Sequence, residues 1–438
     1  MTHVTANQPM VFRLRNNSIV SPRIRPITPP SSERHSPPRS VGERFQHACV
    51  DRRLTRDAAS SGASTKSLFT SLVRAGATTL MLLLALPLLS GCETLGYYTQ
   101  AASGHLELMR ARRSVDTVIA DPETPALLRE RLTLTRSMLA FAQTELGLPA
   151  AGQYRHFVEL DRDAVVYNVM AAPRYGFDPV LWCFPIAGCV AYRGYFARSR
   201  AEAKAADLAA SGLDVYVGGA AAYSTLGWFD DPLLSSFIWR EEADLAELLF
   251  HELAHVRIYL SGDTTFNESF ATFVGREGAE RWLEQHGRDP ERDRWQAQIR
   301  VREDFVRFAL DWREHMAHRY RELAAEGADE EQLEAKRVAL WTAMRTAWLE
   351  QRAGEAARYD GFFSAEASNA RLNAVADYHG KLDAFAALFE VEGADFEAFY
   401  AAVEELAALP ADAREAALAE LASPLRSPMR ARGQDSSR

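Results

Sequence analysis

The feature that most constrains the fold is a helix predicted over 240–260. Apolar side chains recur there every three or four residues, which places them on one face of an α-helix: Leu245, Leu248, Leu249, Leu253, Val256 and Leu260. Acidic residues stand in its first turn, where the helix dipole favours negative charge. Along this helix runs His251-Glu252-Leu253-Ala254-His255, an HExxH motif. The motif is therefore expected on an ordered helix whose apolar face is covered.

The spacing of this motif points to a metal ion. Residues four apart are neighbours on a helix, so the imidazoles of His251 and His255 can hold one ion. Glu252 is offset from them and can reach a water on that ion. The chemistry expected of the pattern is zinc-activated hydrolysis with Glu252 as general base. The alternative is a surface helix with two solvated histidines.

A third ligand is expected on the next helix. After a break at Gly262-Asp263, a second helix is predicted from about Asn267 to Gln285, with Glu268 at its start. Two antiparallel helices joined by a short loop would bring Glu268 against the ion. Two His, one Glu and a water form a catalytic zinc set with an open fourth position. The alternative for Glu268 is a helix-capping role.

A peptidase also needs a donor that stabilises the oxyanion of the reaction intermediate. Tyr259 lies four residues after the second histidine, on the same face; the alternative is packing against the next helix. Tyr378 and His379 belong to C-terminal helices that could fold over the cleft. With Asn369 and Asn373 they form a polar run on an otherwise apolar helix, and the alternative is a helix-packing network.

The remaining candidates are weaker. Asp263 and Asn267 could orient a ligand histidine, or could serve the loop and the helix N-terminus. Trp228, Phe229 and Asp230 could line a substrate groove, or could pack in the core. The other histidines of the folded part are expected on the surface or in the core: His105, His156, His286, His315 and His318.

The N-terminal part has the composition of an export signal. Residues 1–65 are rich in Ser, Pro and Arg and are predicted to be disordered. Residues 66–91 have the pattern of a signal peptide, with a basic start and an apolar run. The run ends in Leu89-Ser90-Gly91-Cys92, which resembles a lipoprotein lipobox and implies a lipid on Cys92. Because Glu93 follows, we expect a cell-envelope lipoprotein at the outer membrane, facing the periplasm.

Two further cysteines, Cys183 and Cys189, are six residues apart. In an oxidising periplasm they can form a disulfide in a small loop, which Pro185 and Gly188 would help to turn. Two buried free thiols are the alternative.

Charge and pattern set the domain organisation. Of 50 basic and 59 acidic residues, twelve basic but only four acidic ones lie in 1–91. The acidic remainder excludes nucleic acid as the main partner. We expect a catalytic part over 92–290, a helical part over 291–423 and a disordered tail over 424–438. The expected helices are 93–113, 125–146, 199–211, a hairpin over 294–354 turned at Gly327, and three over 365–420; the expected strands are 155–170, 213–217 and 223–229.

Four segments carry a specific resemblance: HELAHxxxY, NESFA, WCFPIxGCxAYRGYF and AYSTLGWFDDP. Together they resemble the bacterial putative zinc aminopeptidase family, a lipoprotein group, across most of 92–410. The resemblance implies a zincin-like, mostly helical α+β fold and a peptide substrate. It also implies that His251, His255 and Glu268 bind zinc and that Glu252 is catalytic. Twelve residues separate His255 from Glu268, a shorter gap than in better-known gluzincins.

Two alternatives remain at this point. One is a non-catalytic envelope lipoprotein with a structural zinc, which would need a fourth protein ligand. The other is a zinc endopeptidase, because an aminopeptidase also needs an acid for the α-ammonium group of its substrate. The sequence carries no signal for an oligomeric state.

Overall fold

The computed structural model describes residues 93–184, 188–222, 224–225, 229–352, 356–364 and 368–423. The chain divides into two units, Asn17–Tyr97 and a second that comprises Met1–Asn16 and Tyr98–Arg438. Of the first unit, only the helical residues 93–97 are described. The predicted head, signal peptide, lipidated Cys92 and C-terminal tail all lie outside the described residues. From Tyr98 onward, the described residues belong to the second unit.

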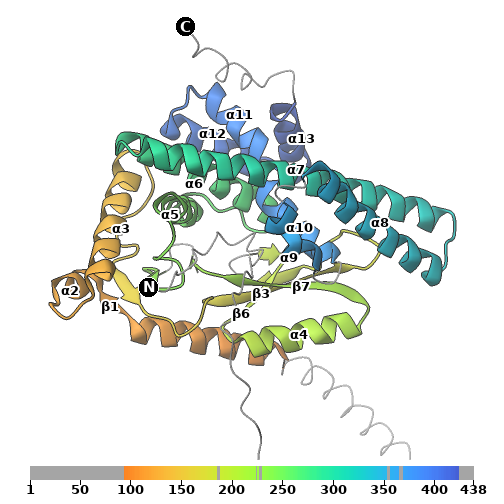
Figure 1. The fold of residues 1–438 in the computed structure, drawn as a ribbon, viewed down its shortest axis with the longest axis horizontal. Coiled ribbons are helices and arrows are strands. Elements are labelled where there is room, and N and C mark those ends of the chain that lie inside the picture. Colours follow the sequence, from red (N-terminus) through yellow and green to blue (C-terminus); the bar gives the residue numbers. More distant parts are fainter. Residues whose placement is uncertain are drawn as a thin grey trace, which may run out of the picture. The chain divides into compact units, whose positions relative to one another are not determined.

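The described chain is mostly helical with small sheets, as the predicted α+β class requires (Figure 1). The helices are 93–111, α2 (Val115–Ala120), α3 (Ala126–Thr144), α4 (Arg198–Ala210), α5 (Glu242–Arg257), α6 (Thr264–Gln285), α7 (Asp289–Ala325), α8 (Glu330–Gln351), α9 (Ala356–Ser364), α10 (Asn369–His379), α11 (Leu382–Val391), α12 (Phe396–Ala408) and α13 (Ala411–Leu421). Among the described residues, no helix is both long and apolar enough to cross a membrane.

The strands form three small sheets. They are β1 (Arg113–Ser114), β2 (His156–Val158), β3 (Val166–Pro173), β4 (Trp182–Phe184), β5 (Gly188–Val190), β6 (Arg193–Tyr195), β7 (Leu213–Ala220) and β8 (Leu233–Leu234). The largest sheet is antiparallel with the order β6-β3-β7, and it lies between α4 and α10 (Figure 1). A second has the order β1-β2-β8, and β4 pairs with β5 in a hairpin.

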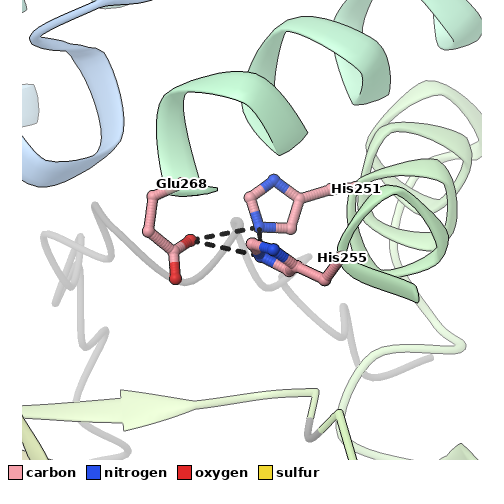
Figure 2. Close-up of side chains that lie close together, drawn as sticks. All are labelled: His251, His255 and Glu268. Atoms are coloured by element: carbon pink, nitrogen blue, oxygen red, sulfur yellow. Dashed lines mark hydrogen bonds and ion pairs between the residues drawn. The ribbon is translucent and has the colours of Figure 1, made fainter. Parts of the chain in front are cut away.

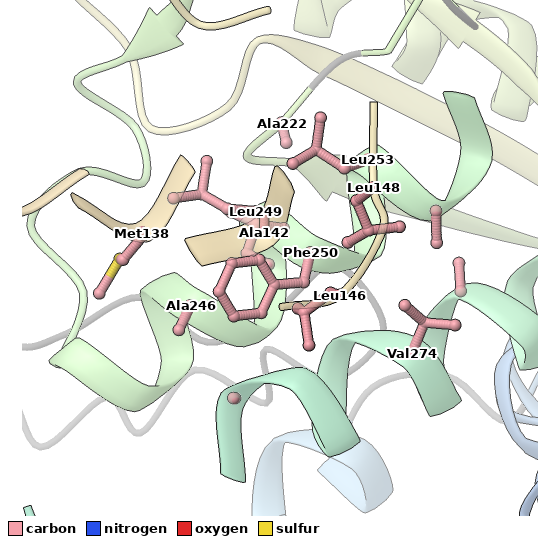
Figure 3. Close-up of a cluster of buried hydrophobic side chains, with 14 of the residues drawn as sticks. Met138, Ala142, Leu146, Leu148, Ala222, Ala246, Leu249, Phe250, Leu253 and Val274 are labelled. Carbon is pink, nitrogen blue, oxygen red and sulfur yellow. The ribbon is translucent and has the colours of Figure 1, made fainter. Parts of the chain in front are cut away.

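Helix α5 is enclosed on all sides. Every residue from Ala243 to His255 is buried, including the polar ones. Its apolar side chains pack with those of α3 and α6 in the main core, which includes Leu249, Phe250 and Val274 (Figure 3). The close approach of α6 requires Gly275, because a Cβ there would lie 2.6 Å from the backbone oxygen of Glu247. The amphipathic pattern thus marked a helix that is buried on every side rather than a surface helix.

Most predicted elements are confirmed, with three corrections. The strand expected over 155–170 is two strands, β2 and β3, in different sheets, because a turn over 161–163 separates them. Helix α6 begins at Thr264 rather than Asn267, since Asp263 caps it. The last part holds four helices, not three, because turns follow α10 and α11 and Pro410 ends the next linker. The strand expected over 223–229 lies mostly outside the described residues.

Candidate metal centre

Helix α5 presents the two histidines of the motif side by side. His251 and His255 are only 9 % and 7 % exposed, and the Nε2 atoms are 3.2 Å apart. Both are therefore interior groups. The alternative of two solvated histidines on a surface helix is wrong, because α6, α7 and α3 cover α5.

Helix α6 supplies the third donor, Glu268, after a short loop that side-chain hydrogen bonds hold in place. The Asn267 side chain accepts a hydrogen bond from the Leu260 backbone N–H and donates one to the Leu260 carbonyl, both 2.7 Å. Asp263 caps α6 by accepting from the Phe266 N–H at 3.0 Å. These bonds fix where α6 begins, so that Glu268 in its second turn faces α5. The capping role considered for Glu268 belongs to Asp263 instead.

The three side chains converge on one point (Figure 2). Glu268 Oε2 lies 3.3 Å from His251 Nε2 and 3.5 Å from His255 Nε2. Among the residues that the structure describes, no other group of three or more His, Cys, Asp or Glu side chains converges in this way. Three buried donor atoms at mutual distances of 3.2–3.5 Å could hold one metal ion.

The buried charges of the group are strongly coupled. Burial by itself would raise the pKa of Glu268, but the adjacent imidazoles of His255 and His251 lower it to about 2. Burial opposes a charge on His255, yet the Glu268 carboxylate raises its pKa. Burial also raises the pKa of Glu252, against the attraction of both imidazoles. Glu268 is thus held as an anion, which is the form that binds metals.

The sequence model of a family described as "Putative aminopeptidase" matches residues 96–418. The chain belongs to this family. No curated protein and no solved structure matches the chain. The matched residues include α5, α6 and all three converging donors. The candidate site therefore lies within the part of the chain that matches the aminopeptidase family.

Tyrosines surround the candidate metal centre of this family member. The Tyr378 ring stacks on His251 with 6.1 Å between ring centres, whereas Tyr259 meets His255 edge-on at 6.4 Å. Burial, together with Glu268, raises the pKa of Tyr259 to about 12. Burial and the charges of Glu268 and Glu252 hold the pKa of Tyr378 and Tyr192 well above the usual value. Sequence reasoning missed Tyr192, although it lies in one of the segments that carried the resemblance.

Helix α10 packs against the start of α6. Thr265 donates to Asp377 at 3.1 Å, and Ser269 donates to the Asp377 carbonyl at 3.3 Å. Burial raises the pKa of Asp377 to about 7. The amides of Asn369 and Asn373 instead donate to carbonyls between Pro173 and Phe177, so these two belong to a helix-packing network. Of α10, the C-terminal end with Tyr378 reaches the candidate metal centre.

The other predicted site residues lie either at the loop between α5 and α6 or at the surface. Asp263 forms an ion pair with Arg414 at 2.9 Å, and Asn267 is hydrogen-bonded to the backbone of Leu260 in the loop. Neither side chain is therefore directed to an imidazole. Phe229 is exposed and its ring lies 4.7 Å from His105. Asp230 is exposed as well, and Trp228 lies outside the described residues.

An acid of the AYSTLGWFDDP segment, Asp231, lies close to the motif. Asp231 is buried, and its Oδ2 accepts from the Thr225 N–H at 2.8 Å. Burial raises its pKa to about 6, and the charge of Glu252 adds to the shift. The remaining histidines that the structure describes take no part in the candidate metal group. His286, for example, packs on Trp282 with 3.6 Å between ring centres.

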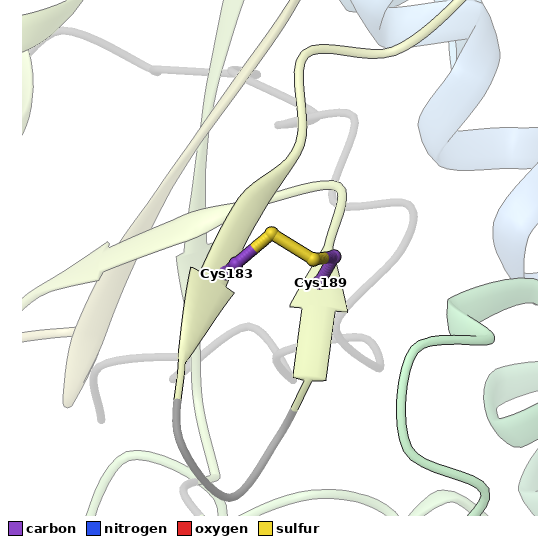
Figure 4. The surroundings of a disulfide bond; sticks show 2 residues. All are labelled: Cys183 and Cys189. Atoms are coloured by element: carbon purple, nitrogen blue, oxygen red, sulfur yellow. A yellow bond between two sulfur atoms is a disulfide. The ribbon is translucent and has the colours of Figure 1, made fainter.

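Cys183 and Cys189 are opposite each other in the β4–β5 hairpin, and a disulfide joins them (Figure 4). Gly188 of this hairpin touches the loop between α5 and α6. A Cβ on Gly188 would lie 2.4 Å from Ser261 Oγ and 2.7 Å from the backbone nitrogen of Gly262. The hairpin therefore packs against the loop that leads to Glu268.

Proposed function

We propose that the protein is a zinc-dependent peptidase, and an aminopeptidase in particular. The observation that carries the proposal is the buried triangle of His251, His255 and Glu268 donor atoms, with sides of 3.2, 3.3 and 3.5 Å. Ligands 2.0–2.1 Å from a tetrahedral zinc ion lie about 3.3 Å from each other. The donor set, two imidazoles and a carboxylate, is also one that zinc takes in hydrolases. Membership of the aminopeptidase family supports the reaction class.

When bound, zinc activates a water molecule and polarises the scissile carbonyl. Glu252 then acts as general base: it takes the proton of the attacking water and delivers it to the leaving amine. Its burial and raised pKa suit this exchange, because a base works best when its pKa approaches the working pH. Glu252 shares α5 with both imidazoles but is not one of the converging donors.

Two tyrosines are candidates for the donor to the oxyanion. Tyr259 follows α5 and lies beside His255, while Tyr378 reaches His251 from α10. Both keep their hydroxyl proton at neutral pH because burial and nearby carboxylates raise the pKa. Comparing Tyr259→Phe with Tyr378→Phe assigns the role to the variant that loses turnover while it retains zinc.

A structural zinc site is the rival interpretation. It needs a fourth protein ligand, and in the described part of the chain no fourth His, Cys, Asp or Glu joins the group. The three-donor set therefore favours a catalytic site. Peptides are the substrate class, and hydrolysis of free against N-acetylated peptides separates an aminopeptidase from an endopeptidase.

We also propose that the enzyme is a lipoprotein, anchored through Cys92 in the outer membrane and facing the periplasm. The lipobox-like Leu-Ser-Gly-Cys run supports the anchor. The Cys183–Cys189 disulfide supports an oxidising compartment.

The test separates zinc binding from chemistry. Glu268→Ala should lose zinc, because two ligands hold the ion poorly. Glu252→Gln should keep zinc but lose roughly 10²-fold or more of peptide hydrolysis, because an amide is not a base. Glu284→Gln, at an exposed glutamate of α6, is the control and should change neither property. Normal hydrolysis by Glu252→Gln together with full zinc in Glu268→Ala would contradict both assignments and favour the structural-zinc rival.

A further inference from the structure

The helix over 93–111 is docked on the fold by one face. Its inner residues recur every four positions: Gln100 is 6 % exposed, Leu108 is 2 % exposed, and Gly104 is buried between them. The Gln100 amide donates to a carbonyl of β6 at 3.3 Å, and its oxygen accepts from the Phe196 N–H at 3.2 Å. At Gly104 the approach is so close that an added Cβ would overlap the Phe196 ring. The helix is therefore a fixed part of the fold rather than a flexible stalk.

The opposite face of this helix is apolar and exposed. Leu95, Tyr98 and Leu106 are 69 %, 42 % and 49 % exposed, and Ala102 between them is exposed as well. Spacings of three and four residues place these four side chains in one row, which we call the outer stripe. The helix thus has two apolar sides, one packed on the fold and one at the surface.

The exposed part of the helix also lacks charge over most of its length. Between Glu93 and Glu107 the sequence holds no Asp, Glu, Lys or Arg, although these residues make up 25 % of the chain. The one histidine in this stretch is His105, and burial together with Arg112 lowers its pKa. A solvated helix face normally carries charged side chains. A face without them can enter the interfacial layer of a bilayer without dehydrating an ion.

The place of the helix in the chain indicates what covers the outer stripe. The helix begins at Glu93, directly after Cys92, the residue that we propose carries the lipid. Because an α-helix rises 1.5 Å per residue, Leu106 lies only about 20 Å along the axis from Glu93. From Tyr98 onward, the helix runs along one edge of the fold, away from α7 and the C-terminal helices (Figure 1). A rigid helix in this position meets the same bilayer that holds the acyl chains.

We propose that the outer stripe lies in the interfacial layer of the membrane that holds the lipid anchor. The inference rests on the proposed anchor at Cys92 and adds a second contact with that bilayer. Leu95 and Leu106 reach the boundary of the acyl chains, and the Tyr98 ring lies at the level of the headgroups, where aromatic side chains are common. Because the inner face is fixed to the fold, this contact gives the protein one orientation on the membrane.

The test uses the lipidated protein in vesicles of phosphatidylethanolamine and phosphatidylglycerol, with one nitroxide label. Ala102→Cys places the label on the outer stripe, and Ala343→Cys, at an exposed alanine of α8, is the matched control. Cys183 and Cys189 are joined and Cys92 carries the lipid, so the label reacts with the introduced thiol. Electron paramagnetic resonance compares collisions of the label with oxygen, which concentrates in the bilayer, and with a water-soluble nickel chelate. We expect an oxygen-to-nickel ratio about tenfold higher at residue 102 than at residue 343.

Leu95→Asp together with Leu106→Asp puts charge on the outer stripe. In this background the Ala102→Cys label should return to water while the protein stays anchored, and an unchanged ratio would contradict the contact. If the double variant does not fold, the comparison of the two labels decides.

Mass spectrometry of Cys92 separates this inference from the anchor on which it rests. Lipid on Cys92 with equal ratios at both labelled positions would overturn the contact and leave the anchor intact. Cys92 without lipid would overturn both. A label at residue 102 that is shielded from oxygen and nickel alike would also overturn the contact, because a second copy of the chain would then cover the outer stripe.

Discussion

At the residue scale, the proposed metal centre depends on ionisable groups that are buried together. Glu268 is held as an anion by two imidazoles, although burial alone favours its neutral form. Asp377, on the neighbouring helix, instead accepts a hydrogen bond from the Thr265 hydroxyl through its Oδ1. Burial outweighs this bond and raises the pKa of Asp377 to about 7, from an ordinary value of 3.8. The pKa values of two buried acids close to one site are thus shifted in opposite directions.

The raised pKa of Asp377 predicts that the free energy of unfolding depends on pH. The folded protein binds the Asp377 proton more tightly than the unfolded chain does, so stability falls as pH rises from about 4 to about 7. Asp377→Asn imitates the neutral acid and should remove that slope, by up to ~4 kcal/mol on an order-of-magnitude scale. Urea unfolding of the zinc-free protein at pH 5 and pH 8 measures it. Asp383→Asn, at an exposed acid, is the control; parallel slopes in wild type and Asp377→Asn would contradict the prediction.

At the element scale, two contacts set the position of the proposed metal ligands. The first is the close packing of α5 on α6 at Gly275, whose added Cβ would also lie 3.1 Å from the Cβ of His251. The second is the contact between the disulfide hairpin and the loop that joins the two helices. In each contact a glycine lies so close to the backbone of another segment that an added Cβ would force one of the two segments to move.

Gly275→Ala should therefore destabilise the protein, although alanine normally favours a helix over glycine by about 1 kcal/mol. The nearest atom to the new methyl group is a backbone oxygen, which cannot rotate away. We expect a loss of roughly 1–3 kcal/mol and weaker zinc binding, because α6 must move away from His251. Gly96→Ala is the matched control, since no described atom lies within 4 Å of an added Cβ there. Equal unfolding midpoints for both variants would disprove the packing argument.

The disulfide should likewise support metal binding. Alkylation of the denatured, unreduced protein should find neither Cys183 nor Cys189 free. Replacing both by Ser should lower the unfolding free energy by on the order of 2 kcal/mol, because a short loop is no longer closed. Zinc affinity should also fall, since a less rigid β4–β5 hairpin would hold the loop at Ser261 and Gly262 less tightly in place. Two reactive thiols in freshly isolated protein, or unchanged zinc affinity in the double variant, would refute this prediction.

At the scale of the whole molecule, segments far apart in the sequence build the site. Arg414 on α13 pairs with Asp263, the N-cap of the helix that carries Glu268. Helix α10 connects the β6-β3-β7 sheet with α6 and brings Tyr378 to His251. The C-terminal helices therefore help to support the proposed metal centre, in addition to the α5–α6 pair.

The proposed lipid anchor concerns the whole molecule as well. Cys92→Ser removes the thiol that would be lipidated, so signal processing should stop and a longer precursor should accumulate. Immunoblots of membrane and soluble fractions measure both effects. Cys183→Ser is the control for a lost cysteine and should be processed and anchored normally. A Cys92→Ser protein that is processed and fully soluble would exclude the anchor.

The sequence by itself determined the local features: the helix with His251 and His255, the helix with Glu268, and the cysteine pair. These features depend on short spacings, because four residues make about one helical turn and a short loop returns the chain. Only the tertiary structure decided that α5 is buried on every side, that Tyr378 rather than Asn373 reaches the candidate metal centre, and that a cavity forms between α6, α7 and α11. The physical reason is that burial and long-range contacts depend on helix packing, which brings together residues more than a hundred positions apart, whereas sequence periodicity reports only which face of a helix is apolar.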